Sequence, residues 1–437
     1  MIRIHLALQG GGSHGAFTWG VLDRLLEEPA LEIGALSGAS AGAMNAVVLA
    51  HGLLQGGRAG ARAALAQFWQ AVGQRAPFRA WSDDPGASAD GVQPGARLAW
   101  KALAPWMRML SPYQLNPFDI NPLRDIVESQ IDFAALRAHS PVGLHIATTR
   151  VANGMLRLFG AHEMSADVLL ASACLPTLHH AIEIDGEAYW DGGLSANPPV
   201  FPLVFDRRAE DLVFVLLDPF PHAEVPHTRE DIAERLTDIS FHAALYTELQ
   251  ALARAQHEAR QNAFAFGRLE RRLARLRTHR IDAQAFMSGL AALSKINTDA
   301  AFIARLHEEG RRSAADWLTA RSSSLGRRST FDPASLTAAP PPRTGWHCGS
   351  TSNCLAASAS PTRPWNRGTL TAARFSLGLS PRPCSPATAS RCASSRQLQS
   401  QAACASKSSP SPGRAPPSPA VAPASAARIF NTSDFLL

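Results

Sequence analysis

The sequence contains few cysteines, and they are unevenly placed. Five of the six lie beyond residue 333, and only Cys174 precedes them. A disulfide framework is therefore excluded over most of the chain, and the spacing of the other five matches no zinc-binding pattern. An isolated cysteine is typical of a reducing compartment, so we expect a cytoplasmic protein.

Acidic residues are absent from a long C-terminal stretch. Residues 333–433 contain ten Lys or Arg and no Asp or Glu. Taking these ten charges and the closing Asp434 out of the formal net charge of +6 leaves −3 for residues 1–332. The basic balance thus belongs to the tail, and we expect no nucleic-acid partner. Because Ser, Ala, Pro and Arg dominate without periodicity, we expect residues 322–437 to form a low-complexity, disordered tail.

Long apolar runs and a targeting segment are also missing. The chain starts directly on the apolar stretch 2–8, without the h-region or cleavage site of a secretory signal. No run approaches the roughly 18 uncharged apolar residues that a membrane-spanning helix needs. We expect no membrane span, although transient contact with a membrane surface remains compatible with the sequence.

A serine motif stands at the centre of the N-terminal region. Residues 38–42 read Gly-Ala-Ser-Ala-Gly, between an apolar stretch at 31–36 and a long apolar stretch at 43–54. This order predicts a buried strand, a sharp turn carrying Ser40, and a buried helix. Gly38 and Gly42 keep Cβ atoms away from the turn, and the helix N-terminus places partial positive charge where an oxyanion would form.

A glycine-rich loop precedes that motif. Gly10, Gly11, Gly12, His14 and Gly15 follow the strand predicted over residues 2–8 and precede a helix predicted over 16–28. Their spacing also fits the dinucleotide-binding pattern, which makes an oxidoreductase a rival function. That function requires an acidic residue at the end of the second strand, where the chain instead has Leu-Ser-Gly. Backbone N–H groups of such a loop serve an oxyanion as well as a pyrophosphate.

The order of elements predicts the fold class. Two strand–loop–helix units within about 50 residues indicate an α/β protein with a parallel sheet and helices on both faces. We expect residues 1–220 to form this catalytic domain. Residues 221–321 are rich in Leu, Arg and Glu at helical spacing and are expected to form a helical extension packed on it.

An Asp-Gly-Gly turn is the third element. A hairpin predicted over 182–190 ends in Asp191, Gly192 and Gly193. Acyl transfer needs a nucleophile, a base and oxyanion donors, and the three elements supply one each. A Ser-Asp-His triad is an alternative, because four histidines follow the aspartate: His222, His227, His242 and His257. Asp191 acting directly on Ser40 explains the chain order better.

Together, the three elements resemble the signature blocks of the patatin-like phospholipases in order and spacing, over roughly residues 1–220. The resemblance implies a three-layer α/β/α sandwich with a mainly parallel sheet. It also implies a lipid acyl hydrolase with a Ser-Asp dyad that needs no metal or other cofactor. Ser40 resembles the nucleophile, Asp191 the base, and Gly10, Gly11 and Gly12 the oxyanion donors.

One position departs from the family's pattern. The family's loop commonly has Lys or Arg where this chain has His14, and an imidazole titrates near neutrality. We therefore expect any help from His14 to an oxyanion or an anionic head group to depend on pH. A catalytically silent lipid-binding module and the dinucleotide-binding oxidoreductase remain the alternative functions.

Overall fold

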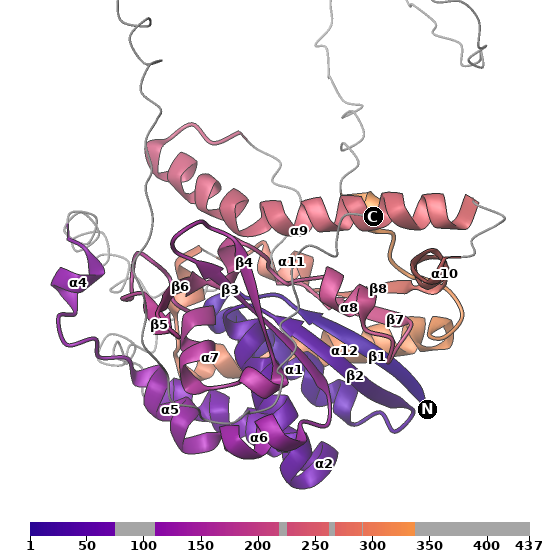
Figure 1. Ribbon diagram of the computed structural model, residues 1–437, viewed down its shortest axis with the longest axis horizontal. Coiled ribbons are helices and arrows are strands. Elements are labelled where there is room, and N and C mark those ends of the chain that lie inside the picture. Colours follow the sequence, from indigo (N-terminus) through magenta and orange to yellow (C-terminus); the bar gives the residue numbers. More distant parts are fainter. Residues whose placement is uncertain (75–109, 218–224, 262–266, 291, 337–437) are drawn as a thin grey trace, which may run out of the picture. The chain divides into compact units, whose positions relative to one another are not determined.

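The computed structural model describes residues 1–74, 110–217, 225–261, 267–290 and 292–336 (Figure 1). Within these residues an eight-stranded sheet has the order β5-β6-β3-β2-β1-β7-β8, and β4 pairs with β3 beside this path. The strands are β1 (Ile2–Leu8), β2 (Leu31–Gly38), β3 (Gly143–Arg150), β4 (Leu156–Gly160), β5 (Ile182–Ile184), β6 (Glu187–Asp191), β7 (Asp211–Val215) and β8 (Arg277–Ile281).

The helices of the described residues vary widely in length. They are α1 (Gly15–Leu26), α2 (Ala41–Gln74), α4 (Pro112–Leu115), α5 (Pro122–Gln130), α6 (Phe133–His139), α7 (Ala166–Ser172), α8 (Phe201–Phe205), α9 (Arg229–Gln261), α10 (Arg268–Arg275), α11 (Gln284–Met287) and α12 (Ala300–Arg321). Helix α2 is interrupted at Gly56 and Gly57, whose backbone dihedrals are not helical.

The centre of the sheet is parallel. β1 pairs in parallel with both β2 and β7, β2 with β3, and β7 with β8. The pairing sets Leu8 beside Gly38 at the carboxyl ends of β1 and β2. Loops that follow neighbouring parallel strands meet at the same edge of the sheet. The glycine loop and the serine turn therefore lie next to each other.

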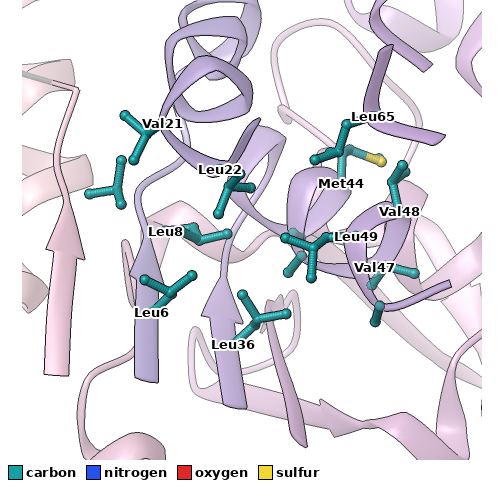
Figure 2. Packing of buried hydrophobic residues seen from close by; sticks show 14 of the residues in the cluster. Leu6, Leu8, Val21, Leu22, Leu36, Met44, Val47, Val48, Leu49 and Leu65 are labelled. Atoms are coloured by element: carbon teal, nitrogen blue, oxygen red, sulfur yellow. The ribbon is translucent and has the colours of Figure 1, made fainter. Parts of the chain in front are cut away.

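The alternation of side chains along the strands builds two hydrophobic layers. Leu6 and Leu8 of β1 face α1 and α2, where they pack with Leu22 and Leu49 (Figure 2). The intervening Ala7 faces the opposite layer, which α8, α9 and α10 complete through buried leucines and valines. Because successive strand residues point to opposite faces, one sheet serves both layers. The predicted α/β/α sandwich with a mainly parallel sheet is thereby confirmed.

The region predicted as a helical extension differs from the prediction. It contains β8, which pairs with β7 and so belongs to the same sheet as the N-terminal strands. Its sequence, Arg-Thr-His-Arg-Ile, lacks an apolar pattern, yet Thr278 and His279 are buried. Both are satisfied by polar partners: Thr278 Oγ1 donates to the Phe331 carbonyl at 2.6 Å, and His279 Nε2 lies 3.0 Å from Asp211 Oδ1.

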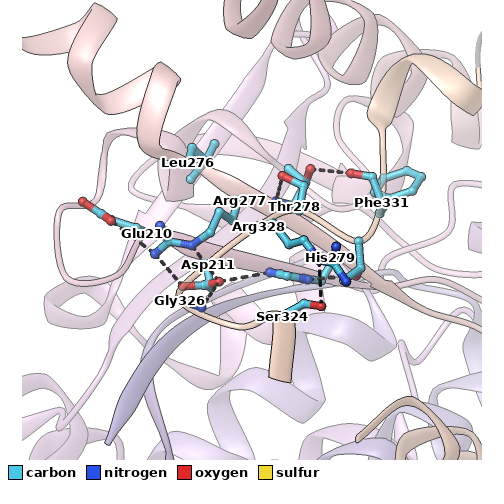
Figure 3. A network of polar contacts seen from close by, with 12 residues as sticks. Glu210, Asp211, Leu276, Arg277, Thr278, His279, Ser324, Gly326, Arg328 and Phe331 are labelled. Atoms are coloured by element: carbon cyan, nitrogen blue, oxygen red, sulfur yellow. Dashed lines mark hydrogen bonds and ion pairs between the residues drawn. The ribbon is translucent and has the colours of Figure 1, made fainter. Parts of the chain in front are cut away.

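Those partners show that the fold continues past Arg321. Phe331 is buried against Phe214 of β7, and its N–H donates to the Thr278 carbonyl. The Gly326 N–H donates to Asp211 Oδ1 at 2.9 Å, within the polar network drawn in Figure 3. Residues 322–336 are thus packed on the sheet and do not belong to the tail predicted to start at residue 322. The rest of that predicted tail lies outside the described residues.

Candidate active site

Ser40 occupies a strained backbone position just beyond the carboxyl end of the central strand β2. It stands between β2 and α2, and its φ of 52° lies in the left-handed region that non-glycine residues rarely adopt. Such a strand-to-helix turn exposes the serine hydroxyl above the carboxyl ends of the strands, beside the N-terminus of α2. The N-terminal dipole of that helix favours negative charge beside the serine.

The backbone of Ser40 is held by Ser172 at the end of α7. The Ser40 N–H donates to both the carbonyl oxygen and the Oγ of Ser172, each at 3.0 Å. Ser172 has no exposed surface. A bifurcated hydrogen bond to this buried residue stabilises the left-handed backbone conformation of Ser40.

The glycine loop contacts the serine turn directly. A Cβ on Gly10 would lie 2.9 Å from the Ser40 Cβ and 2.5 Å from the Ala39 carbonyl oxygen, so position 10 admits no side chain. The Gly10 N–H donates to Asn197 Oδ1 at 2.7 Å, and Asn197 Nδ2 donates to the Gly10 carbonyl at 3.3 Å. Gly10 was predicted to donate to an oxyanion, but its N–H is already used.

The next two glycines remain as donors. Among the described residues, neither the Gly11 nor the Gly12 N–H donates to another protein group. Gly12 has a φ of +59°, which turns the backbone between the strand and α1. Successive N–H groups in such a turn form an anion-binding concavity.

Asp191 is fixed at every polar atom of its backbone. Its N–H donates to the Cys174 carbonyl at 2.8 Å, and its own carbonyl accepts from Thr149 Oγ1 at 2.8 Å. The strand register explains why it reaches the serine. Gly38 lies beside Ile146, so two residues further along Ser40 is level with Thr148, which pairs with Asp191. The two predicted catalytic residues thus flank the end of β3.

The carboxylate of Asp191 is buried. Its side-chain Oδ1 accepts from the Gly193 N–H at 2.7 Å, while Oδ2 is buried without a hydrogen bond of good geometry among the described residues. Burial raises the pKa of Asp191 to about 7, although the Gly193 N–H and the Ser40 side chain both act to lower it. A carboxylate with this pKa exchanges a proton near neutral pH.

The remaining glycines of the motifs are sites of close backbone approach. A Cβ on Gly42 would lie 2.2 Å from the Leu8 carbonyl oxygen, and one on Gly38 would lie 2.5 Å from the Gly42 carbonyl carbon. A Cβ on Gly192 would meet the Ala147 carbonyl oxygen at 2.1 Å. The last two approach side chains: Gly15 those of Ala41 and Trp69, and Gly193 that of Phe241.

The histidines of the triad alternative are not gathered at Asp191. His242 is buried on α9 with its Nδ1 beside the Asp238 carbonyl, and His257 hydrogen-bonds to Gln261 one turn away. His227 is exposed, and His222 lies outside the described residues. Besides burial, the Gly193 N–H and the Ser40 side chain act on the pKa of Asp191, and no histidine of the described residues does; this favours direct pairing of aspartate and serine.

Sequence reasoning missed the residues that hold the motifs in place. Asn197 stands in an Asn-Pro-Pro run that does not indicate this role, and Ser172 gives no signal because it is one small polar residue in an apolar helix. His14 was expected near the oxyanion, but its Nε2 lies 2.8 Å from the Oγ of Ser294 and its ring packs near Phe302.

No metal or membrane feature emerges from the described part of the chain. Within it, no group of three or more His, Cys, Asp or Glu side chains is placed to hold a metal ion. None of the helices there combines the length and apolar character needed to cross a bilayer.

Fold and site together define an α/β protein with a serine on a strand-to-helix turn. Residues 6–204 match the family model of Patatin-like phospholipase. Among solved structures, VipD from Legionella pneumophila is similar with a TM-score of 0.37 and 16% identity, over 73% of this chain and 67% of VipD. No curated protein matches the chain.

Proposed function

We propose that the chain hydrolyses carboxylic esters of lipids through a dyad of Ser40 and Asp191. The observation that carries the proposal is the pairing of a serine at φ 52° with a buried carboxylate whose pKa is raised to about 7. A base of this pKa is half ionised near neutrality and can both take a proton and return it. The match of residues 6–204 to the family model supports the same chemistry.

The first half of the reaction forms an acyl-enzyme. Ser40 Oγ attacks the ester carbonyl carbon, and its proton passes to the Asp191 carboxylate. The tetrahedral oxyanion accepts hydrogen bonds from the N–H groups of Gly11 and Gly12 and lies at the positive end of α2. When the intermediate collapses, the carbon–oxygen bond to the alcohol breaks and Asp191 gives its proton to the leaving alkoxide.

The second half releases the fatty acid. A water molecule gives a proton to Asp191 and attacks the acyl carbon, and a second oxyanion forms in the same place. Collapse breaks the bond to Ser40 Oγ, which recovers its proton from Asp191. One residue therefore acts as base and acid in turn, and no cofactor is required.

The residues packed against the glycine loop argue against the dinucleotide-binding alternative. The carbonyl oxygen of Ser294 accepts from Ser13 Oγ at 2.7 Å, and that of Lys295 would lie 2.2 Å from a Cβ on Gly12. A pyrophosphate bound by a glycine loop sits at the start of the following helix. Here the backbone of Ser294 and Lys295 is packed against that part of the loop and takes up space that a pyrophosphate would need.

Contact with a lipid surface is supported by exposed apolar side chains around α4. Phe118 is 84% exposed and Ile120 67% exposed. The segment is anchored close to the site, because the Tyr113 ring stacks on His180 at 4.1 Å. The His180 carbonyl in turn accepts from the thiol of Cys174, the residue that binds the Asp191 N–H.

The experiment that tests the function compares wild type with Ser40→Ala. Both full-length proteins are incubated with a series of nitrophenyl esters of increasing chain length and with phosphatidylcholine vesicles. We expect wild type to release nitrophenol and fatty acid and Ser40→Ala to release neither. Equal turnover by a folded Ser40→Ala protein would exclude the serine, and inactive wild type would favour the silent lipid-binding module.

A further inference from the structure

A short segment outside the matched domain is packed on the glycine loop. The 3-10 helix η5 (Ala292–Ile296) lies well beyond residue 204, where the family match ends. Ser294 in this helix is fully buried. Its carbonyl accepts from Ser13 Oγ at 2.7 Å, and its Oγ lies 2.8 Å from His14 Nε2. Ser294 therefore binds the two residues that directly follow Gly12.

The backbone of the same segment makes a third contact with the loop. A Cβ on Gly12 would lie 2.2 Å from the Lys295 carbonyl oxygen and 3.2 Å from its carbon. The peptide of Lys295 thus occupies the space in which a side chain at position 12 would stand. The 3-10 helix η5 therefore contacts Gly12 and the two residues that follow it.

That turn is also linked to the other side of the site. Lys295 Nζ lies 3.9 Å from Asp238 Oδ1 on α9. One turn further along α9, the Phe241 ring lies against Gly193, where a Cβ would meet its atoms at 2.6 and 2.8 Å. The segment containing Ser294 therefore connects the glycine loop with the helix that covers the Asp191 turn.

We propose that Ser294 is a positioning residue for ester hydrolysis, an inference that rests on the proposed function. By holding Ser13 and His14, it fixes the direction in which the Gly11 and Gly12 N–H groups point. Preorganised donors stabilise a developing oxyanion because they need no reorientation during the reaction. A loop of three successive glycines has wide backbone freedom, so it depends on such a tether.

The role of His14 changes accordingly. His14 stands where the family commonly has Lys or Arg, and its Nε2 lies 2.8 Å from Ser294 Oγ, so on this proposal it acts on the oxyanion through the loop. Since the oxyanion exists in the transition state and not in the bound ester, loosening the tether should lower kcat and leave KM unchanged.

The test uses Ser294→Ala in the full-length chain with a soluble nitrophenyl ester. We expect kcat to fall about tenfold, as for the loss of one buried hydrogen bond, with KM unchanged and the melting temperature lowered by no more than a few degrees. Ser288→Ala is the matched control, because Ser288 is exposed and its hydroxyl bonds only within its own helical turn, to the Ala285 carbonyl. It should behave as wild type.

Two further variants keep the proposal open to refutation if Ser294→Ala is unstable. Ser13→Ala removes the other hydrogen bond from the loop side and should give the same split between kcat and KM. The double variant with His14→Ala and Ser294→Ala should lose no more kcat than His14→Ala alone, because both substitutions remove the same contact.

The outcomes separate this proposal from the proposed function. Wild-type kcat in both Ser294→Ala and Ser13→Ala, additive losses in the double variant, or losses that follow the melting temperature would overturn the positioning role and leave the Ser40 chemistry intact. Absence of Ser40-dependent hydrolysis in wild type would overturn both.

Discussion

The side-chain amide of Asn197 binds both polar groups of the Gly10 peptide. Oδ1 accepts from the Gly10 N–H at 2.7 Å, and Nδ2 donates to the Gly10 carbonyl at 3.3 Å. Asn197 lies six residues after Asp191, and Gly10 is packed on the Cβ of Ser40. One amide therefore ties the aspartate block to the glycine loop beside the nucleophile.

Asn197→Ala should separate these blocks. Because the loop then loses both hydrogen bonds that fix it beside Ser40, we expect kcat to fall by about tenfold to a hundredfold, less than the loss of a donor itself. Steady-state kinetics with a soluble ester measures this. Asn153→Ala, at an exposed turn, is the control. An unchanged kcat in Asn197→Ala would show that the clamp has no catalytic consequence.

Asp191→Asn should remove the base and the pH dependence that it creates. Since burial raises the pKa of Asp191 to about 7, we expect kcat/KM of wild type to rise with pH through an apparent pKa near that value. The amide cannot take the serine proton, so activity should drop by roughly three to four orders of magnitude. A variant that keeps the wild-type profile would assign the ionisation to another group.

The same substitution should change how stability depends on pH. The folded-state pKa of Asp191 is about 7 and the ordinary value is 3.8, so between these values the folded state holds a proton that the unfolded state has lost. Wild type therefore loses stability as pH rises through this window, by on the order of 4 kcal/mol for the full shift. Asp191→Asn should lack this loss and unfold at higher urea concentration than wild type at pH 8. If the difference between the urea midpoints of wild type and Asp191→Asn were the same at pH 4 and at pH 8, the raised pKa would be contradicted.

Phe331→Ala tests whether residues past Arg321 belong to the fold. Phe331 is 7% exposed and packs edge-on against Phe214, with ring centroids 5.7 Å apart. Removing a buried phenyl ring should cost about 3 kcal/mol of unfolding free energy. Phe118→Ala, an exposed phenylalanine, is the matched control. A chain ending at Arg321 should be destabilised likewise, whereas one ending after residue 336 should melt as the full chain does.

Phe118→Asp tests the proposed lipid contact. A phenyl ring that enters a lipid surface gains about 2 kcal/mol by burial, so its loss should weaken binding to phosphatidylcholine vesicles by roughly tenfold or more. Hydrolysis of a soluble short-chain ester should stay unchanged, because Phe118 is not part of the site. Leu269→Asp, on α10, is a control at an exposed apolar residue elsewhere in the chain. Equal vesicle co-sedimentation of both variants would place the lipid contact elsewhere.

The sequence was sufficient for the fold class and for the three motifs because their signals are local. A strand, a glycine-rich turn and a buried helix follow one another within a few residues, and β1 and β2 must then lie side by side. The same reasoning could not find β8, since Thr278 and His279 are polar. Their burial depends on Phe331 and Asp211, which are distant in the chain.

The tail boundary was placed too early for a related reason. Residues 322–336 contain Ser, Arg and Gly in the proportions of a linker, and their apolar contributions come from single residues such as Leu325 and Phe331. This segment is held by two hydrogen bonds to the sheet: the Thr278 N–H donates to Ser329 Oγ, and the Gly326 N–H donates to the carboxylate of Asp211. Burial and hydrogen bonds with His279 and Arg277 act in opposite directions on the pKa of Asp211, and the hydrogen bonds lower it to about 2.

The residues that hold the catalytic groups in place could not be predicted from the sequence. Ser172 and Ser294 are single small residues in unremarkable contexts, and only the folded chain brings them to Ser40 and to the glycine loop. Motifs predict which groups react. The contacts that orient them come from segments more than a hundred residues away.

The central claim is that Ser40 forms a covalent acyl intermediate with Asp191 as its base, and covalent trapping tests it most directly. The full-length protein is treated with an alkyl fluorophosphonate, and the adduct is located by peptide mass spectrometry. We predict one equivalent of label on Ser40, none on Ser40→Ala, and much slower labelling of Asp191→Asn. Label on another residue, or ester hydrolysis that persists in Ser40→Ala, would contradict the account.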